Sequence, residues 1–238
     1  MTLRFYLNDF KLFNLAEKQN LLVEKPTHLL FKNHLTTILF GVAIVSVYSV
    51  ATSTFIVHLP YYLTIKAGFS HEGSLMILAV AITLVAILTP FFGKLCDKLN
   101  PFLIYNAALS GMIMLSPILF YLLSVSDLIS IITGIAIYSI ITSLISSAIF
   151  SILVGSFPFG VRYSGVSLSF NLSVTIFSSS TPVVLILIEK YFDTPYAPGL
   201  YISVISLGCL LITGYLRKKL HIESFNEQEC ESFIYKGN

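Results

Sequence analysis

Hydroxyl and amide side chains are the groups in this sequence best placed to contact a polar ligand in apolar surroundings. They lie inside six long apolar runs and include Tyr48, Thr52, Ser53, Thr54, Asn106, Thr142 and Asn171. Such groups donate and accept hydrogen bonds without carrying charge near neutral pH. Proton relays and ion-coupling sites inside membranes normally use Asp, Glu, His, Lys or Arg. The runs offer none of these at mid-depth, so we expect any such site to lie elsewhere.

A further polar cluster, Ser178 to Thr181, directly precedes Pro182 in the fifth run. Proline removes one backbone hydrogen bond and can kink a helix, which membrane proteins tolerate when neighbouring groups satisfy the freed carbonyl. Pro90 and Pro117 interrupt the second and third runs in the same way. Two interpretations of the cluster stay open: a flexing or substrate-lining segment, or ordinary bonding of hydroxyls to the helix backbone.

Small residues recur every fourth position in two of the runs. The fourth run carries Ser139, Ser143, Ser147, Ser151 and Gly155, and the fifth begins with Gly165, Ser169 and Ser173. A face of small side chains lets two helix backbones approach closely. A polar face toward an aqueous cavity is the alternative, and both interpretations imply a helix bundle.

The reactive residue types show no pattern typical of an enzyme or a metal site. The three cysteines, Cys96, Cys209 and Cys230, cannot all pair, and we interpret them as free thiols. The five histidines fall in tails and short loops, where we expect exposed or interfacial side chains. No Ser/His, Asp/Asp or metal-binding constellation lies within the runs. The sequence therefore predicts no enzyme, no cofactor and no metal, and its net charge of +2 gives no reason to expect nucleic acid as a partner.

The elements that position these side chains are six membrane-spanning helices. The apolar runs cover residues 35–57, 74–95, 102–125, 128–157, 163–188 and 198–216, and their one formal charge is Lys94. About 20 helical residues cross a hydrocarbon core of about 30 Å. The chain is 55% hydrophobic and 11% charged, with a mean hydropathy of +0.85, whereas soluble domains carry about 25% charged residues. We expect an all-α protein whose principal partner is the lipid bilayer.

The distribution of positive charge predicts the orientation in the membrane. Twelve of the 14 Lys and Arg residues fall on one side of the six spans, and two, Lys66 and Lys190, fall on the other. Under the positive-inside rule both termini are cytoplasmic. We expect a cytoplasmic tail over residues 1–34, a six-helix bundle over 35–217 and a second cytoplasmic tail over 218–238. No signal peptide is apparent, and we expect a multi-pass protein of the cell (inner) membrane.

Two segments resemble known transporter motifs. Residues 93–101 (GKLCDKLNP) are similar to the G-x-L-x-D-R-x-G-R-R loop of the major facilitator superfamily. Asn100, Pro101 and Phe102 stand where the family has its final Gly-Arg-Arg. Residues 157–171 (FPFGVRYSGVSLSFN) resemble F-P-x-x-x-R-Y-[ST]-G-x-[SA]-x-x-[FY]-N of the metabolite:proton symporters, the branch that includes proline/betaine transporters. Residues 59–63 (LPYYL) resemble the exit of helix 7 in that family. The order of these segments implies helices 7 to 12, one half of the family's fold, with residues 1–34 resembling its central loop.

The resemblance implies a half or fragment of a carrier that moves a small metabolite with protons between two six-helix halves. Tyr48, Thr52, Asn171 and Thr181 are the candidates for the substrate pathway, and Gly93, Asp97, Lys98 and Arg162 are the candidates for cytoplasmic gating. The missing half would come from a separate six-helix chain or from a homodimer. A membrane scaffold without a substrate, or a remnant of a split gene, is the alternative. Substrate identity, independent activity, oligomeric state and coupling residues are left open.

Overall fold

Six spanning helices make up the bundle. The computed structural model describes residues 26–125, 127–192 and 194–220, and within them six helices are long and apolar enough to cross a membrane. The elements in chain order are α2 (Pro26–Asn33), α3 (Leu35–Ser53), π-helical η2 (Thr54–His58), α4 (Leu59–Ile65), α5 (His71–Lys98), α6 (Pro101–Ser124), α7 (Leu128–Ser156), the short 3-10 turn η3 (Phe159–Val161), α8 (Arg162–Ser173), π-helical η4 (Val174–Ser178), α9 (Ser179–Tyr191) and α10 (Ala197–Leu220). The all-α prediction with six spans is confirmed. Most of both predicted tails, residues 1–25 and 221–238, lies outside the described part.

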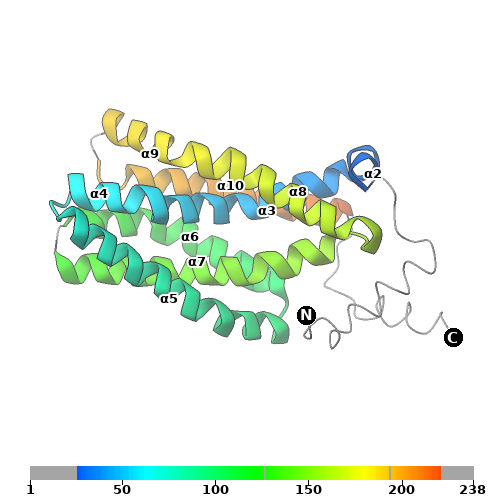
Figure 1. Ribbon diagram of the computed structural model, residues 1–238, viewed down its shortest axis with the longest axis horizontal. Helices are drawn as coiled ribbons and strands as arrows, with labels where there is room; N and C mark the ends of the chain where they lie inside the picture. The colour runs from blue at the N-terminus through cyan, green and yellow to red at the C-terminus, as the bar shows by residue number, and fades with distance from the viewer. Residues whose placement is uncertain (1–25, 126, 193, 221–238) are drawn as a thin grey trace, which may run out of the picture.

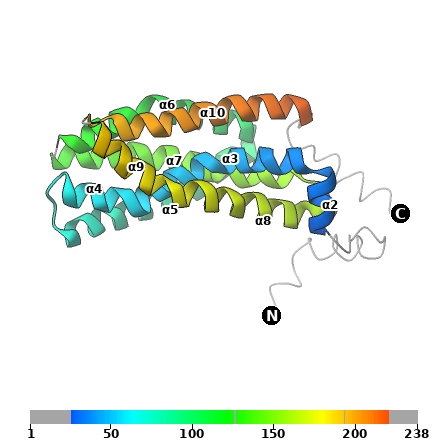
Figure 2. The same ribbon diagram turned by 90° about the horizontal axis from the view of Figure 1, so that it is seen from above.

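Short connections force neighbouring spans to run antiparallel. Figures 1 and 2 show the six spans side by side, with α2 at the end of the bundle where α8 begins. Polar caps fix several helix starts: Ser70 accepts a hydrogen bond from the Gly73 amide, Asn100 from the Phe102 amide and Asp127 from the Ser130 amide. These side chains satisfy amides that the first helical turn leaves unpaired.

Two helices extend beyond the apolar runs. The first run ends at residue 57, yet the helix continues through η2 and α4 to Ile65. The predicted loop at residues 93–101 is helical up to Lys98, so only Leu99 and Asn100 separate α5 from α6. Long lysine side chains can reach water from a helix end, so the charge of Lys94 does not stop the helix.

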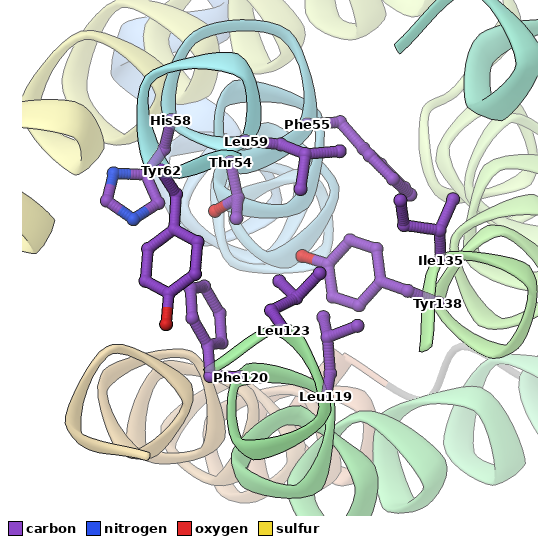
Figure 3. A pocket seen from close by; sticks show the side chains of 10 residues that line it. All are labelled: Thr54, Phe55, His58, Leu59, Tyr62, Leu119, Phe120, Leu123, Ile135 and Tyr138. Carbon is purple, nitrogen blue, oxygen red and sulfur yellow. The ribbon is translucent and has the colours of Figure 1, made fainter. Parts of the chain in front are cut away.

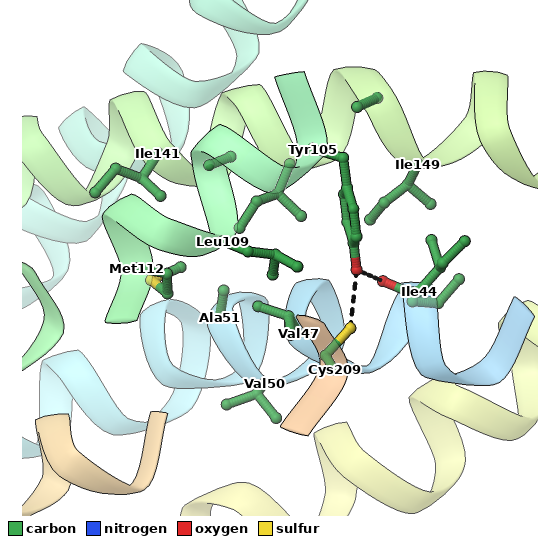
Figure 4. Packing of buried hydrophobic residues seen from close by; sticks show 14 of the residues in the cluster. Ile44, Val47, Val50, Ala51, Tyr105, Leu109, Met112, Ile141, Ile149 and Cys209 are labelled. Atoms are coloured by element: carbon green, nitrogen blue, oxygen red, sulfur yellow. Dashed lines mark hydrogen bonds between the residues drawn. The ribbon is translucent and has the colours of Figure 1, made fainter. Parts of the chain in front are cut away.

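The buried core centres on α3 (Figure 4). The Tyr105 hydroxyl of α6 donates to the Ile44 carbonyl of α3 over 2.7 Å and lies 3.1 Å from the Cys209 sulfur of α10. The Cys209 thiol in turn donates to the Ala43 carbonyl over 2.9 Å. Tyr105 is only 1% exposed, so these contacts pair polar atoms that would otherwise be buried alone. They join α3, α6 and α10, and Cys96 and Cys209 are free thiols as predicted.

Close backbone approach explains most of the small-residue stripes. Ser139 and Ser143 are buried, the Ser143 hydroxyl reaches the Val85 carbonyl of α5, and Ser147 lies 3.5 Å from the Cys96 sulfur. On the fifth span, a Cβ added to Gly41 of α3 would lie 2.7 Å from the Cβ of Ser169. Helix packing is therefore the better interpretation for Ser139, Ser143 and Ser147 of the fourth span and for Ser169 of the fifth. Ser151 and Gly155, at the far end of the first stripe, are exposed.

Serines from neighbouring helices satisfy the carbonyls that two intrahelical prolines leave without a donor. Pro117 cannot bond the Ile113 carbonyl, and the Ser203 hydroxyl of α10 donates to it over 2.7 Å. Pro182 cannot bond the Ser178 carbonyl, and the Ser53 hydroxyl of α3 donates to it over 2.7 Å. Both helices therefore continue through their prolines because a second helix supplies the missing bond.

Candidate functional site

An exposed polar stripe runs along the fifth span. Its members recur at four-residue spacing and are all exposed: Tyr163, Ser167, Asn171, Thr175 and Ser179. Asn171 keeps its amide partly satisfied, because its side-chain nitrogen donates to the carbonyl and hydroxyl oxygens of Ser167. Polar side chains on a spanning helix normally face a water-filled cavity or another helix rather than lipid. We call this surface the α8–α9 stripe.

The four candidate substrate-pathway residues fall into two environments. Tyr48 is half-buried, and its ring centroid lies 6.2 Å from that of Phe170, the neighbour of Asn171 in α8. Thr52 stands one turn further along α3 and is also half-buried. Thr181, in contrast, is fully buried and donates within its own helix to the Phe177 carbonyl. The structure thus brings Tyr48 beside the stripe and places Thr181 inside the bundle.

The four gating candidates lie at one end of the bundle. Asp97 and Lys98 are exposed in the last turn of α5, and Arg162 begins α8 at the same end (Figure 1). The Arg162 Nε donates to the Phe157 carbonyl over 3.1 Å, which ties the residue to the turn that precedes its helix. Nothing lies within 4 Å of a Cβ built on Gly93. Within the described part of this chain Gly93 therefore makes no close contact with another helix.

A buried ionisable pair lies near the opposite end, where the sequence predicted none. His58 Nε2 is 2.9 Å from Glu189 Oε1, with side chains 1% and 9% exposed. Both residues belong to the spanning helices, His58 to the end of η2 and Glu189 to the last turns of α9. The expectation that the spans hold no group of this kind was therefore wrong, as was the expectation of an exposed or interfacial His58. Both residues stand at the edge of an apolar run, and extending each helix by one turn would have included them.

A narrow hollow adjoins His58 (Figure 3). Its walls come from η2, α4, α6 and α7, and it is lined by Thr54, Phe55, His58, Leu59, Tyr62, Leu119, Phe120, Leu123, Ile135 and Tyr138. The space has room for about one water molecule. A metabolite with several non-hydrogen atoms does not fit in it.

Comparisons with known proteins identify the ancestry of the chain. No family model and no solved structure matched. The ectoine/proline transporter ProP of Corynebacterium glutamicum is 24% identical over 232 residues, which cover 92% of this chain and 46% of that protein. The glycine betaine/proline/ectoine/pipecolic acid transporter OusA of Dickeya dadantii is 28% identical over 191 residues, 79% of this chain and 37% of that protein. A Staphylococcus aureus protein, assigned by prediction as a proline/betaine transporter, is 29% identical over 157 residues, 66% of this chain and 34% of its own length.

These relatives are transporters rather than enzymes, and the matched segment is less than half the length of each. The alignment with ProP takes in nearly the whole of this chain, including all six spans that the structure describes. The chain is homologous to proline/betaine transporters of the major facilitator superfamily and corresponds to a part of them.

Proposed function

We propose that this chain is the six-helix half, helices 7 to 12, of a carrier that moves a small zwitterionic or carboxylated osmolyte together with protons. The two relatives are named as transporters of ectoine and proline, and of glycine betaine, proline, ectoine and pipecolic acid. The chain matches less than half of each relative, so a second six-helix unit is needed for the alternating-access architecture. A separately encoded six-helix chain, or a second copy of this one, can supply that unit.

The observation that carries the proposal is the α8–α9 stripe. Five polar side chains on one exposed face, Asn171 among them, would be costly against hydrocarbon. They are accommodated if the stripe faces an aqueous pathway between two halves. Along α5, on the other exposed flank, the described buried residues are Ser74, Ala81 and Cys96. Both flanks are thus open to a partner unit.

Residue roles follow from these positions. Tyr48, Thr52 and Asn171 would contact the substrate beside the stripe, and Thr181 would act from within the bundle by supporting α9. Gly93, Asp97, Lys98 and Arg162 would make contacts with the second unit on the cytoplasmic side, where both termini would also lie. Gly93 supports this role because its surface is open to a close approach by another helix.

Reconstitution tests the proposal. If the second unit is a separately encoded chain, the purified chain in liposomes with an imposed pH gradient should not accumulate radiolabelled proline or betaine. The same chain together with the first six helices of a relative should accumulate one of them in a gradient-dependent manner. Uptake by the chain without any partner would contradict the need for a second unit from elsewhere and would favour the homodimer. Absence of uptake in every pairing would favour a membrane scaffold or a gene remnant.

The role of Asn171 has its own test in any pairing that transports. Asn171→Ala should reduce uptake at least tenfold, because the amide is the most polar group of the stripe. Asn106→Ala is the matched control, since Asn106 is also an exposed asparagine but belongs to α6, away from the stripe. Equal uptake by wild type and Asn171→Ala would remove Asn171 from the pathway.

A further inference from the structure

Three aromatic side chains from different spans meet beside the α8–α9 stripe. The Phe150 ring of α7 stacks on the Phe170 ring of α8, with centroids 5.7 Å apart and ring planes inclined by 25°. The Phe170 centroid is also 6.2 Å from that of Tyr48 of α3. These separations are typical of aromatic pairs in direct contact. We call the three rings the aromatic wall.

The aromatic wall is open toward the outside of the bundle. Phe150 is 48% exposed, and Tyr48 and Phe170 are half-buried. Ser167, one turn before Phe170 on α8, belongs to the stripe and is exposed as well. Ring faces and hydroxyl groups therefore share the surface that the proposed function places against a second unit.

Carboxylates are confined to the helix ends in the part of the chain that the structure describes. The described acidic residues lie in the first or last turn of a helix or at its cap: Glu72, Asp97, Asp127 and Glu189. Glu189 already has the imidazole of His58 beside it, 2.9 Å away. The middle turns of the described spans therefore offer a cationic ligand group ring faces, hydroxyls and amides rather than carboxylates.

Ring faces and hydroxyl groups select different cations. A quaternary ammonium group has no N–H bond, so it cannot donate a hydrogen bond to a hydroxyl or amide oxygen. The negative face of an aromatic ring attracts such a group when it lies within about 6 Å of the ring centroid, and most strongly where water is excluded. A secondary ammonium group keeps its N–H donors and can use the polar side chains instead. Rings beside a polar stripe thus favour the quaternary ion.

We propose that the aromatic wall binds the quaternary ammonium group of a betaine-type substrate, and that Phe150 and Phe170 are specificity-determining residues. The carboxylate of the same ligand would face the hydroxyl groups of the α8–α9 stripe, which can donate hydrogen bonds to it. The inference rests on the proposed function, because it names the ligand class that this pathway favours and the rings that select it.

Binding can be tested on the chain alone, without transport. The chain is labelled with carbon-13 in its phenylalanine rings and placed in phosphatidylglycerol nanodiscs, whose lipids carry no ammonium group that could compete. Glycine betaine should shift the NMR signals of Phe150 and Phe170 in a saturable manner. The anion of tert-butylacetic acid has the same shape but carbon in place of the charged nitrogen, and it should bind at least tenfold more weakly. Equal responses to the two compounds, or no response to betaine, would overturn the proposal.

Variants at position 150 separate the ring from its apolar bulk. Phe150→Leu stays apolar and should raise the half-saturating concentration of betaine about threefold or more, because one cation–π contact is lost. Phe150→Tyr keeps a ring and should bind betaine as the wild type does. Phe91→Leu, which removes an exposed phenylalanine from α5, is the matched control and should leave betaine binding unchanged. Equal betaine binding by wild type and Phe150→Leu would contradict the role of this ring.

Transport gives a second readout in any pairing that accumulates substrate. Phe150→Leu should lower the uptake of betaine relative to that of proline, because proline keeps N–H donors for the polar stripe. An unchanged ratio would overturn the selective role of the ring while leaving the carrier function in place. Selective betaine binding by a chain that transports in no pairing would have the opposite meaning, since it would refute the carrier function and support the binding site.

Discussion

Most hydroxyl side chains in the described part of this bundle donate to a carbonyl of their own helix, and a few complete the hydrogen bonding of another helix. Ser203 donates to the carbonyl left free by Pro117, and Ser53 does the same for the carbonyl left free by Pro182. Within lipid no water is available to replace these donors, so losing one of them should lower the free energy of unfolding. The serine and its proline should therefore be energetically coupled although they belong to different helices.

A double-mutant cycle on Ser203 and Pro117 measures this coupling. Ser203→Ala should lower the free energy of unfolding by about 1 kcal/mol. In a Pro117→Ala background the new backbone N–H can bond Ile113, so the same serine change should cost clearly less. Unfolding by a denaturing detergent, followed by circular dichroism, gives the four values.

The control for this cycle is Ser206→Ala, because Ser206 is also buried on α10 and, among the described residues, donates only within its own helix, to the Ile202 carbonyl. The loss of unfolding free energy caused by Ser206→Ala should be the same with proline or alanine at position 117. Equal costs for Ser203→Ala in the two backgrounds would show that the hydroxyl does not serve the carbonyl freed by the proline.

The distance between two crossing helices depends on glycine, which has no side chain, at the point of closest approach. Where α10 crosses α6, a Cβ on Gly199 would lie 2.5 Å from the Cα of Pro117 and would also collide with the Ser116 carbonyl oxygen. Both obstacles are backbone atoms, which cannot rotate away as a side chain can. The crossing therefore fixes the start of α10 against the proline of α6, at the same place where Ser203 supplies its hydrogen bond.

Gly199→Ala should consequently destabilise the bundle by about 1–3 kcal/mol, the usual cost of overpacking a tight contact. Gly208→Ala is the matched control on the same helix, because nothing lies within 4 Å of a Cβ at that position. The free energy of unfolding of Gly208→Ala should lie within about 1 kcal/mol of the wild-type value, and any change should be stabilising because alanine favours the helix over glycine. Thermal unfolding in one detergent compares the two variants, and equal melting temperatures would contradict the predicted close crossing.

For the molecule as a whole, the unequal burial of its spans is the main feature. α3 is enclosed by the other helices, whereas α5 and the α8–α9 stripe are open along most of their length. The two ends of the bundle also differ in positive charge. Lys98, Arg162 and Arg217 lie at one end, and Lys66 and Lys190 lie toward the other. This separation of charge is the basis for the predicted orientation in the membrane.

Cysteine labelling tests the orientation directly. In a chain whose native cysteines are replaced, Lys66→Cys should react with an impermeant maleimide added outside intact cells. Lys98→Cys should react only in inside-out vesicles. Both positions are exposed and lie at opposite ends of α5 and its preceding turn, so access within the fold is matched. The reversed pattern would refute the orientation, and labelling of both from one side would refute α5 as a span.

Local composition was sufficient to predict the six helices, because apolar length and the absence of charge act on each segment independently of the others. Motif order likewise predicted the ancestry. The partners of individual polar groups were beyond prediction, since Ser53 and Ser178, or His58 and Glu189, are far apart in the chain and meet only when the helices pack. Hydropathy also placed His58 and Glu189 outside the runs, because a charge lowers the local average whether or not a distant residue compensates it. Their burial follows from pairing, and pairing depends on how the first and fifth spans are packed together.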